Sequence, residues 1–263
     1  LTIGYLVLEA EQVQLMLDDG RMLPARVVAY DLATGFALVQ SLAPLKITPA
    51  ALGQSSGLKV DDPLLMASGM QGGQQGQMGL SRLAAKRSFA GYWEYWIDGA
   101  LFTTPARGTH SGAGLFNQRG ELVGIGSLFV QDVQDRPGVE QTREPGNMFV
   151  PVDLLWPILS ELRKQGRSAA SKRAWLGLNC VEQAGRLRVV RVSEDGPASK
   201  AGVRAGDIIS AIDGSAVTSL EALWKQVWRG AVERDVMLDV ERDASPMQLK
   251  LRSIDRQESM RKP

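Results

Sequence analysis

Short hydrophobic runs separated by polar turns make up most of residues 1–130. Residues 13–17 alternate between apolar and polar side chains. The turn Asp18-Asp19-Gly20 follows, and residues 22–30 form the second strand-like segment after it. Alternation with a period of two on both sides of a glycine-containing turn is typical of a β-hairpin. Many such segments with few helical ones predict an all-β barrel or sandwich.

The hydrophobic pattern then takes a helical period. Leucine and isoleucine recur three and four positions apart between residues 154 and 165, and Gly166 stops the pattern. The segment GRSAASKR, residues 166–173, is small, polar and basic, which is typical of a linker. We therefore expect a first domain at 1–165 and a linker at 166–173.

The remaining chain mixes strand-like and helical patterns. Strand-like runs such as 186–192 alternate with a proline-started short helix after Gly196 and with a helix that Ser219 caps. This order predicts a small α+β domain over 174–254. The polar tail, residues 255–263, is expected to fray.

Composition agrees with two globular domains and excludes several function classes. The chain has 263 residues, 44% of them hydrophobic and 22% charged, which is enough for two cores. The net charge of +1 predicts no binding of nucleic acid. No apolar run is long enough for a transmembrane helix, and the start of the chain lacks the basic residues and cleavage site of a signal peptide. The paired aspartates occur in turns, so we expect no metal and no cofactor.

One stretch contains a candidate catalytic serine. The sequence GTHSGAGLFNQRGELVGIG, residues 108–126, places Ser111 on a glycine-rich turn that leads into a hairpin. A nucleophilic serine can be presented in this way, but glycine–serine turns without any chemistry are also common. Cys180 and His110 are the sole cysteine and histidine, so His110 is the one histidine that could act as a base.

Two motifs near the C-terminus resemble a PDZ domain of the HtrA type: WLGL at 175–178 and GPASKAGVRAGDIISAIDG at 196–214. The preceding part then resembles the HtrA family of trypsin-like serine proteases in five blocks. These blocks are LTIGYLV, DGRMLPARVVAYDLATGFALVQ, LGQSSGLKVDDPLLMASG, HSGAGLFNQRGELVGIG and GNMFVPVDLLWPIL. The resemblance implies a mainly β protein, a trypsin-like double β-barrel followed by a PDZ domain. It also implies barrel strands before the histidine strand, which the sequence lacks.

The family's catalytic triad maps onto this chain with two replacements. The histidine position is Tyr5, the aspartate position is Gly35, and the serine position is Ser111. The oxyanion-hole position, normally glycine, is Thr109, whose β-branched side chain disfavours the backbone angles that glycine adopts. A serine without an adjacent base is a weak nucleophile, and tyrosine keeps its proton at neutral pH. His110, next to Ser111, is expected to point away from it.

The PDZ resemblance implies a peptide-binding groove. A ligand would add as a strand beside Leu178, and its C-terminal carboxylate would meet backbone N–H groups of the preceding loop. The expected groove residues are Trp175, Leu176, Gly177, Leu178, Leu223 and Val227. The leucines and the valine are equally explained as core residues.

We thus expect a non-catalytic peptide-binding, scaffolding or quality-control protein that captures peptides or protein C-termini. Two alternatives remain: an active serine endopeptidase with a rearranged site, and a regulatory subunit of an active homologue. The resemblance further implies a periplasmic or other extracytoplasmic location and a homo-oligomer, a trimer formed through aromatic residues. The aromatic segment Tyr92–Trp96, with Tyr92, Glu94 and Trp96 on one face, could serve that contact or pack in the barrel.

Overall fold

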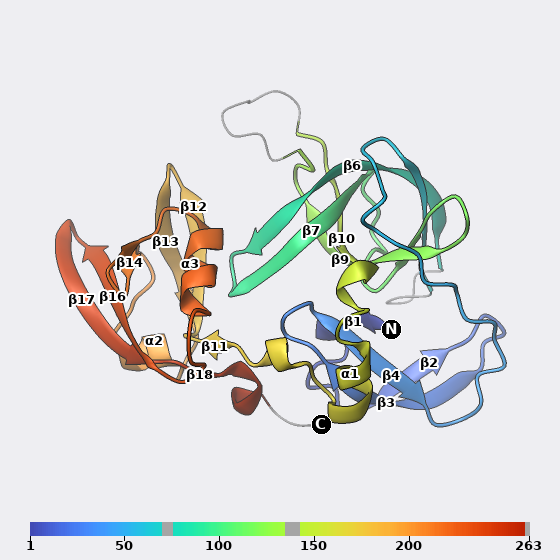
Figure 1. The fold of residues 1–263 in the computed structure, drawn as a ribbon, viewed down its shortest axis with the longest axis horizontal. Coiled ribbons are helices and arrows are strands. Elements are labelled where there is room, and N and C mark those ends of the chain that lie inside the picture. The colour runs from blue at the N-terminus through green and yellow to red at the C-terminus, as the bar shows by residue number, and fades with distance from the viewer. Residues whose placement is uncertain (70–75, 135–142, 261–263) are drawn as a thin grey trace. The chain divides into compact units, whose positions relative to one another are not determined.

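The computed structural model describes residues 1–69, 76–134 and 143–260 (Figure 1). The chain forms two compact units. The first comprises Leu1–Ser88 and Asp98–Ala169, and the second comprises Phe89–Ile97 together with the described residues from Ala170 onwards. The short segment Phe89–Ile97 lies in the middle of the predicted first domain, yet it packs with the second unit.

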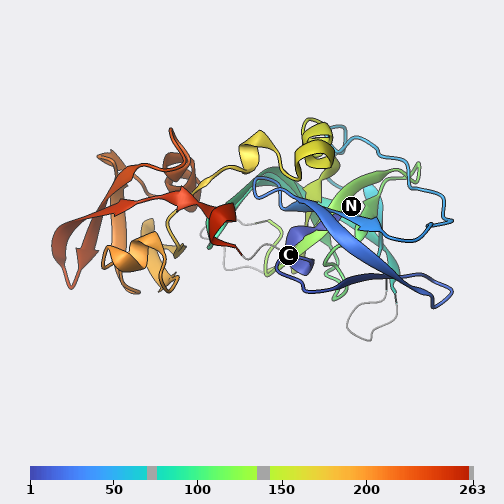
Figure 2. The same cartoon turned by 90° about the horizontal axis from the view of Figure 1, so that it is seen from below.

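The first unit begins with an open, antiparallel sheet of four strands in the order β1-β4-β3-β2. The strands are β1 (Thr2–Ile3), β2 (Val13–Met16), β3 (Met22–Tyr30) and β4 (Phe36–Ser41), and the 3-10 turn η1 (Gly4–Leu6) follows β1. The twist of this sheet is visible in the blue strands of Figure 2. The double β-barrel expected from the sequence therefore has an open sheet in the place of its first barrel.

The remaining strands of the first unit form a closed barrel in the order β10-β7-β6-β5-β8-β9. They are β5 (Pro63–Ala67), β6 (Met78–Gly91), β7 (Tyr95–Thr104), β8 (Gly114–Phe116), β9 (Leu122–Val130) and β10 (Gly146–Pro151). Leu64, Leu101, Leu115 and Phe149 are among its core residues, each at most 2% exposed. Inward-facing apolar residues on alternate positions account for this core.

After the barrel come η2 (Val152–Leu154), α1 (Leu159–Gln165) and η3 (Ala169–Ser171). The predicted helix over 154–165 is therefore shorter than expected, because Pro157 has no N–H and disfavours helical angles in the residue before it. Gly166 ends α1 with a φ of 75°, as predicted.

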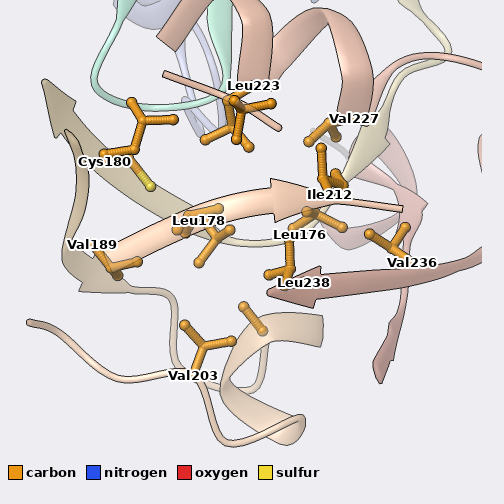
Figure 3. Close-up of a cluster of buried hydrophobic side chains, with 14 of the residues drawn as sticks. Leu176, Leu178, Cys180, Val189, Val203, Ile212, Leu223, Val227, Val236 and Leu238 are labelled. Atoms are coloured by element: carbon orange, nitrogen blue, oxygen red, sulfur yellow. The ribbon is translucent and has the colours of Figure 1, made fainter. Parts of the chain in front are cut away.

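The second unit contains a sheet in the order β12-β13-β14-β16-β17, with β15 paired to β14. These strands are β12 (Leu178–Gln183), β13 (Arg186–Val192), β14 (Ile208–Ile212), β15 (Ser215–Ala216), β16 (Asp235–Arg242) and β17 (Ser245–Arg252). The helices are α2 (Pro197–Lys200) and α3 (Leu220–Val227), and Ser219 caps α3 by accepting a hydrogen bond from the Ala222 N–H. Trp224 of α3 is fully buried in the core of this unit, part of which Figure 3 shows.

Two segments are more ordered than the sequence suggested. In the predicted linker, Ser168 and Ser171 are buried, and Ser168 hydrogen-bonds the carboxylate of Asp31. At the start of the predicted tail, β18 (Ile254–Asp255) pairs with β11 (Ala174–Trp175), and η4 (Arg256–Ser259) follows. Both segments owe their order to contacts with residues far away in sequence.

Candidate functional site

Ser111 lies on the turn that leads into β8, in the hairpin formed by β8 and β9. The turn is held by backbone bonds from Gly112 N–H to Gly126 O at 2.8 Å and from Gly126 N–H to Ala113 O at 2.8 Å. A Cβ atom on Gly126 would lie 1.8 Å from the carbonyl oxygen of His110, so only glycine fits there. The glycines therefore hold the serine turn tightly against β9.

Tyr5, on η1, reaches this serine directly. Its Oη atom is 2.7 Å from Ser111 Oγ and 2.5 Å from the carbonyl oxygen of Ser127. Burial raises the pKa of Tyr5 above its ordinary value near 10, and the hydrogen bond with Ser111 opposes this shift. A phenol that keeps its proton at neutral pH is not able to accept the proton of the serine hydroxyl.

A backbone hydrogen bond holds Gly35 against η1, the 3-10 turn that carries Tyr5. Its carbonyl oxygen accepts a hydrogen bond of 2.6 Å from the N–H of Gly4, and its φ is 77°, which suits glycine. The nearest acidic residue in sequence, Asp31, is fully buried and accepts bonds from the backbone and hydroxyl of Thr34. The three expected triad positions thus come together, but the aspartate position supplies no carboxylate.

Thr109 and His110 both face the loops around the hairpin. Thr109 is 2% exposed, and its Oγ1 atom lies 2.9 Å from Ser68 Oγ. Thr109 is not among the described residues with positive φ, so it does not take up a glycine-type backbone conformation. His110 Nδ1 lies 2.9 Å from the carbonyl oxygen of Arg107. Because a carbonyl oxygen can only accept a hydrogen bond, Nδ1 carries the proton in this contact. That bond ties the ring to its own loop.

The loop between β11 and β12 holds a carboxylate, that of Glu94 from the turn between β6 and β7. Oε1 of Glu94 accepts bonds from the N–H groups of Gly177 at 2.7 Å, Leu178 at 3.0 Å and Leu176 at 3.1 Å. Gly177 has a φ of 82°, which lets successive N–H groups converge on one point. The loop expected to bind a C-terminal carboxylate is thus shaped as an anion-binding nest. No local sequence pattern indicates that Glu94 would occupy this nest.

The electrostatic environment of Glu94 follows from this contact. Burial raises the pKa of Glu94 to about 7, while the backbone N–H groups and the positive charge of Arg256 oppose the shift. Burial, with the nearby charge of Glu94 as a smaller cause, raises the pKa of the Cys180 thiol well above its ordinary value. Cys180 is a buried free thiol, as expected for a small core residue.

The four apolar residues expected to line the groove are buried in the core of the second unit. Leu176, Leu223 and Val227 are 0% exposed and Leu178 is 1% exposed. Figure 3 shows all four in one cluster. They pack as core residues in this structure, and their role as groove lining stays a prediction.

Two wider features concern cofactors and membranes. Among the described residues, no group of three or more histidine, cysteine, aspartate or glutamate side chains is placed to hold a metal ion. None of the helices in the described parts of the chain is long and apolar enough to cross a membrane.

Comparison with known proteins agrees with this architecture. Residues 1–125 match the trypsin-like peptidase domain family, and residues 174–252 match the PDZ domain family. The periplasmic pH-dependent serine endoprotease DegQ of Escherichia coli K12 is 28% identical over 265 residues, which cover 95% of this chain and 55% of DegQ. The periplasmic serine endoprotease DegP of the same strain is 26% identical over 271 residues, covering 95% of this chain and 53% of DegP. The chain spans about half the length of these curated relatives.

Solved structures share the fold. The HtrA-type protease AlgW with a decapeptide has a TM-score of 0.56 at 22% identity, covering 100% of this chain and 79% of that one. The serine endoprotease from Yersinia pestis has a TM-score of 0.53 at 21% identity, covering 97% of this chain and 84% of that one. The chain thus carries a trypsin-like peptidase domain followed by a PDZ domain, and over 95% of its length it is similar to the serine endoproteases DegQ and DegP.

Proposed function

We propose that this protein is a non-catalytic HtrA-type protein that binds peptides or protein C-termini through its PDZ domain. The observation that carries the proposal is the nest of N–H groups at Leu176, Gly177 and Leu178, which binds a carboxylate with three converging donors. Backbone nests of this kind capture C-terminal carboxylates, and an adjacent strand edge supplies main-chain hydrogen bonds. The β12 edge beside the nest provides that second element.

The geometry at Ser111 supports the non-catalytic part of the proposal. The group in contact with the serine hydroxyl is the phenol of Tyr5, whose raised pKa keeps it protonated. Gly35 has no side chain to orient a base. Without a base, the serine hydroxyl is a weak nucleophile.

A periplasmic or other extracytoplasmic location belongs to the same proposal. DegQ and DegP are both named as periplasmic, which supports it. Assembly into a homo-oligomer, a trimer by family resemblance, also stays a proposal.

An active serine endopeptidase is the second candidate. It is supported by the retained Ser111 on its tight hairpin and by the relatives, which are named as serine endoproteases. The two candidates differ in the reactivity of Ser111, which labelling with an active-site probe measures directly.

Peptide binding should depend on a free C-terminal carboxylate. We expect amidation of a peptide with a hydrophobic C-terminus to weaken its binding about 10- to 100-fold, because the nest loses its charged acceptor and a charge-assisted hydrogen bond contributes roughly 1.5–3 kcal/mol. Fluorescence anisotropy with the free and amidated forms measures this, and N-terminal acetylation of the same peptide serves as the control. Equal dissociation constants for the free and amidated peptides would refute carboxylate capture.

A further inference from the structure

The carboxylate nest of the PDZ domain already holds a ligand from its own chain. Glu94 belongs to Phe89–Ile97, which packs within the same compact unit as the nest. The turn between β6 and β7, which carries Glu94, lies beside α3 in Figure 1. The nest and its ligand are therefore parts of one packed unit.

The backbone next to Glu94 runs along the edge of β12 as a bound peptide would. Trp93 forms an antiparallel bridge with Asn179. The carbonyl oxygen of Tyr92, two residues before Glu94, accepts a hydrogen bond of 2.6 Å from the N–H of Cys180. A strand added to a sheet edge, followed by a carboxylate in a nest, is the arrangement by which PDZ domains hold C-terminal peptides. Here a glutamate side chain takes the place of the C-terminal carboxylate.

Side chains secure the segment against α3. The indole Nε1–H of Trp224 donates a hydrogen bond of 2.8 Å to the carbonyl oxygen of Gly91. The ammonium group of Lys225 lies 4.6 Å from the centre of the Trp96 ring, a cation–π contact. Trp93 and Tyr95 stack with their ring centroids 5.4 Å apart. These contacts hold the segment on both sides of Glu94.

We propose that residues Gly91–Glu94 are an internal ligand of the PDZ groove, and that a C-terminal peptide binds only by displacing Glu94 from the nest. This inference rests on the proposed function, because it takes the nest as the site of peptide capture. The class of external ligand is a protein or peptide with a free C-terminal carboxylate. Its apparent dissociation constant equals the intrinsic constant divided by the fraction of molecules in which the nest is open.

The pH dependence of displacement has a definite sign. In the docked segment the pKa of Glu94 is about 7, against an ordinary value of 4.5 when the side chain is free. The docked form therefore binds more protons between these values, so docking is strongest below about pH 4.5 and weakens as the pH rises to 7. The charged and titratable groups that act on Glu94 are the guanidinium of Arg256 and the Cys180 thiol. The peptide carboxylate also stays ionised, so peptide affinity should increase with pH.

The test compares three proteins by anisotropy with one labelled peptide that ends in a hydrophobic residue with a free carboxylate. They are the wild type, Glu94→Ala, and Glu194→Ala, which removes an exposed acidic residue of the same unit. We expect Glu94→Ala to bind about 10- to 100-fold more tightly and to lose the rise in affinity between pH 5 and 8. Glu194→Ala should behave as the wild type does.

A second measurement keeps the test independent of any loss of stability in Glu94→Ala. Hydrogen exchange at the amides of Leu176 and Gly177 in the wild type, corrected for the intrinsic pH dependence of exchange, should be slow at pH 5 and faster at pH 8, because the docked segment opens as Glu94 ionises. Unchanged affinity and pH profile in Glu94→Ala, with carboxylate-dependent binding in the wild type, would overturn the internal ligand and leave the proposed function standing. Failure of both the wild type and Glu94→Ala to bind the peptide would overturn both.

Discussion

Turnover of an unfolded protein substrate should be about 10⁴-fold or more below that of an active HtrA relative under the same conditions. Loss of a single triad member typically removes several orders of magnitude of rate, and here the histidine and aspartate positions hold Tyr5 and Gly35. The Tyr5 hydroxyl contacts Ser111 but keeps its proton, because burial raises its pKa. Cleavage of a labelled casein, followed by fluorescence, measures the rate.

Ser111→Ala is the matched variant for this prediction. Because Ser111 has no adjacent base to activate it, the residual rate should be the same in the variant and the wild type. The double variant Tyr5→His with Gly35→Asp should also stay inactive, because Thr109 remains at the oxyanion-hole position. A wild-type rate close to that of the relative, abolished by Ser111→Ala, would show that Ser111 is a working nucleophile.

Replacing Trp224 by alanine should destabilise the second unit by about 3–5 kcal/mol, the usual cost of removing a fully buried large side chain. Trp224 is 0% exposed and belongs to the core around α3. The substitution also removes the donor to the carbonyl oxygen of Gly91, so the internal ligand should be released more readily. Urea unfolding, followed by circular dichroism, gives the free energy of unfolding.

Two controls separate the causes of that loss. Trp156→Ala removes a tryptophan that is 52% exposed and should change the free energy of unfolding by less than about 0.5 kcal/mol. Trp224→Phe keeps an aromatic ring in the core but not the N–H donor, and should cost less than the alanine variant. If Trp224→Ala unfolded at the same urea concentration as the wild type, the assignment of Trp224 to the core would be wrong.

The sequence predicted those elements that depend on local patterns. The apolar run at 186–192 is strand β13 in the structure. Ser219 caps α3 as expected, with its hydroxyl oxygen accepting from the Ala222 N–H. Alternation, caps and turn residues act over a few positions, so they can be read from one sequence.

Contacts between distant residues were not predictable in this way. Asp31 and Ser168 are 137 positions apart, and their hydrogen bond orders a segment whose composition indicated a linker. Glu94 and Gly177 are 83 positions apart. In the sequence, Glu94 appeared only as one position of an aromatic strand, because no local pattern marks a side chain that fills a distant loop. The family resemblance did align Tyr5 with Ser111, and the structure places their hydroxyl oxygens 2.7 Å apart.

The reactivity of Ser111 decides whether this protein is a non-catalytic binding protein or a protease. A fluorophosphonate probe bonds covalently to a serine that an adjacent base activates, and mass spectrometry of the digested protein then locates the label. We expect Ser111 to stay unlabelled under conditions in which an active HtrA relative is labelled to completion. Stoichiometric labelling at Ser111, absent from Ser111→Ala, would instead identify the protein as a serine hydrolase and refute the non-catalytic function.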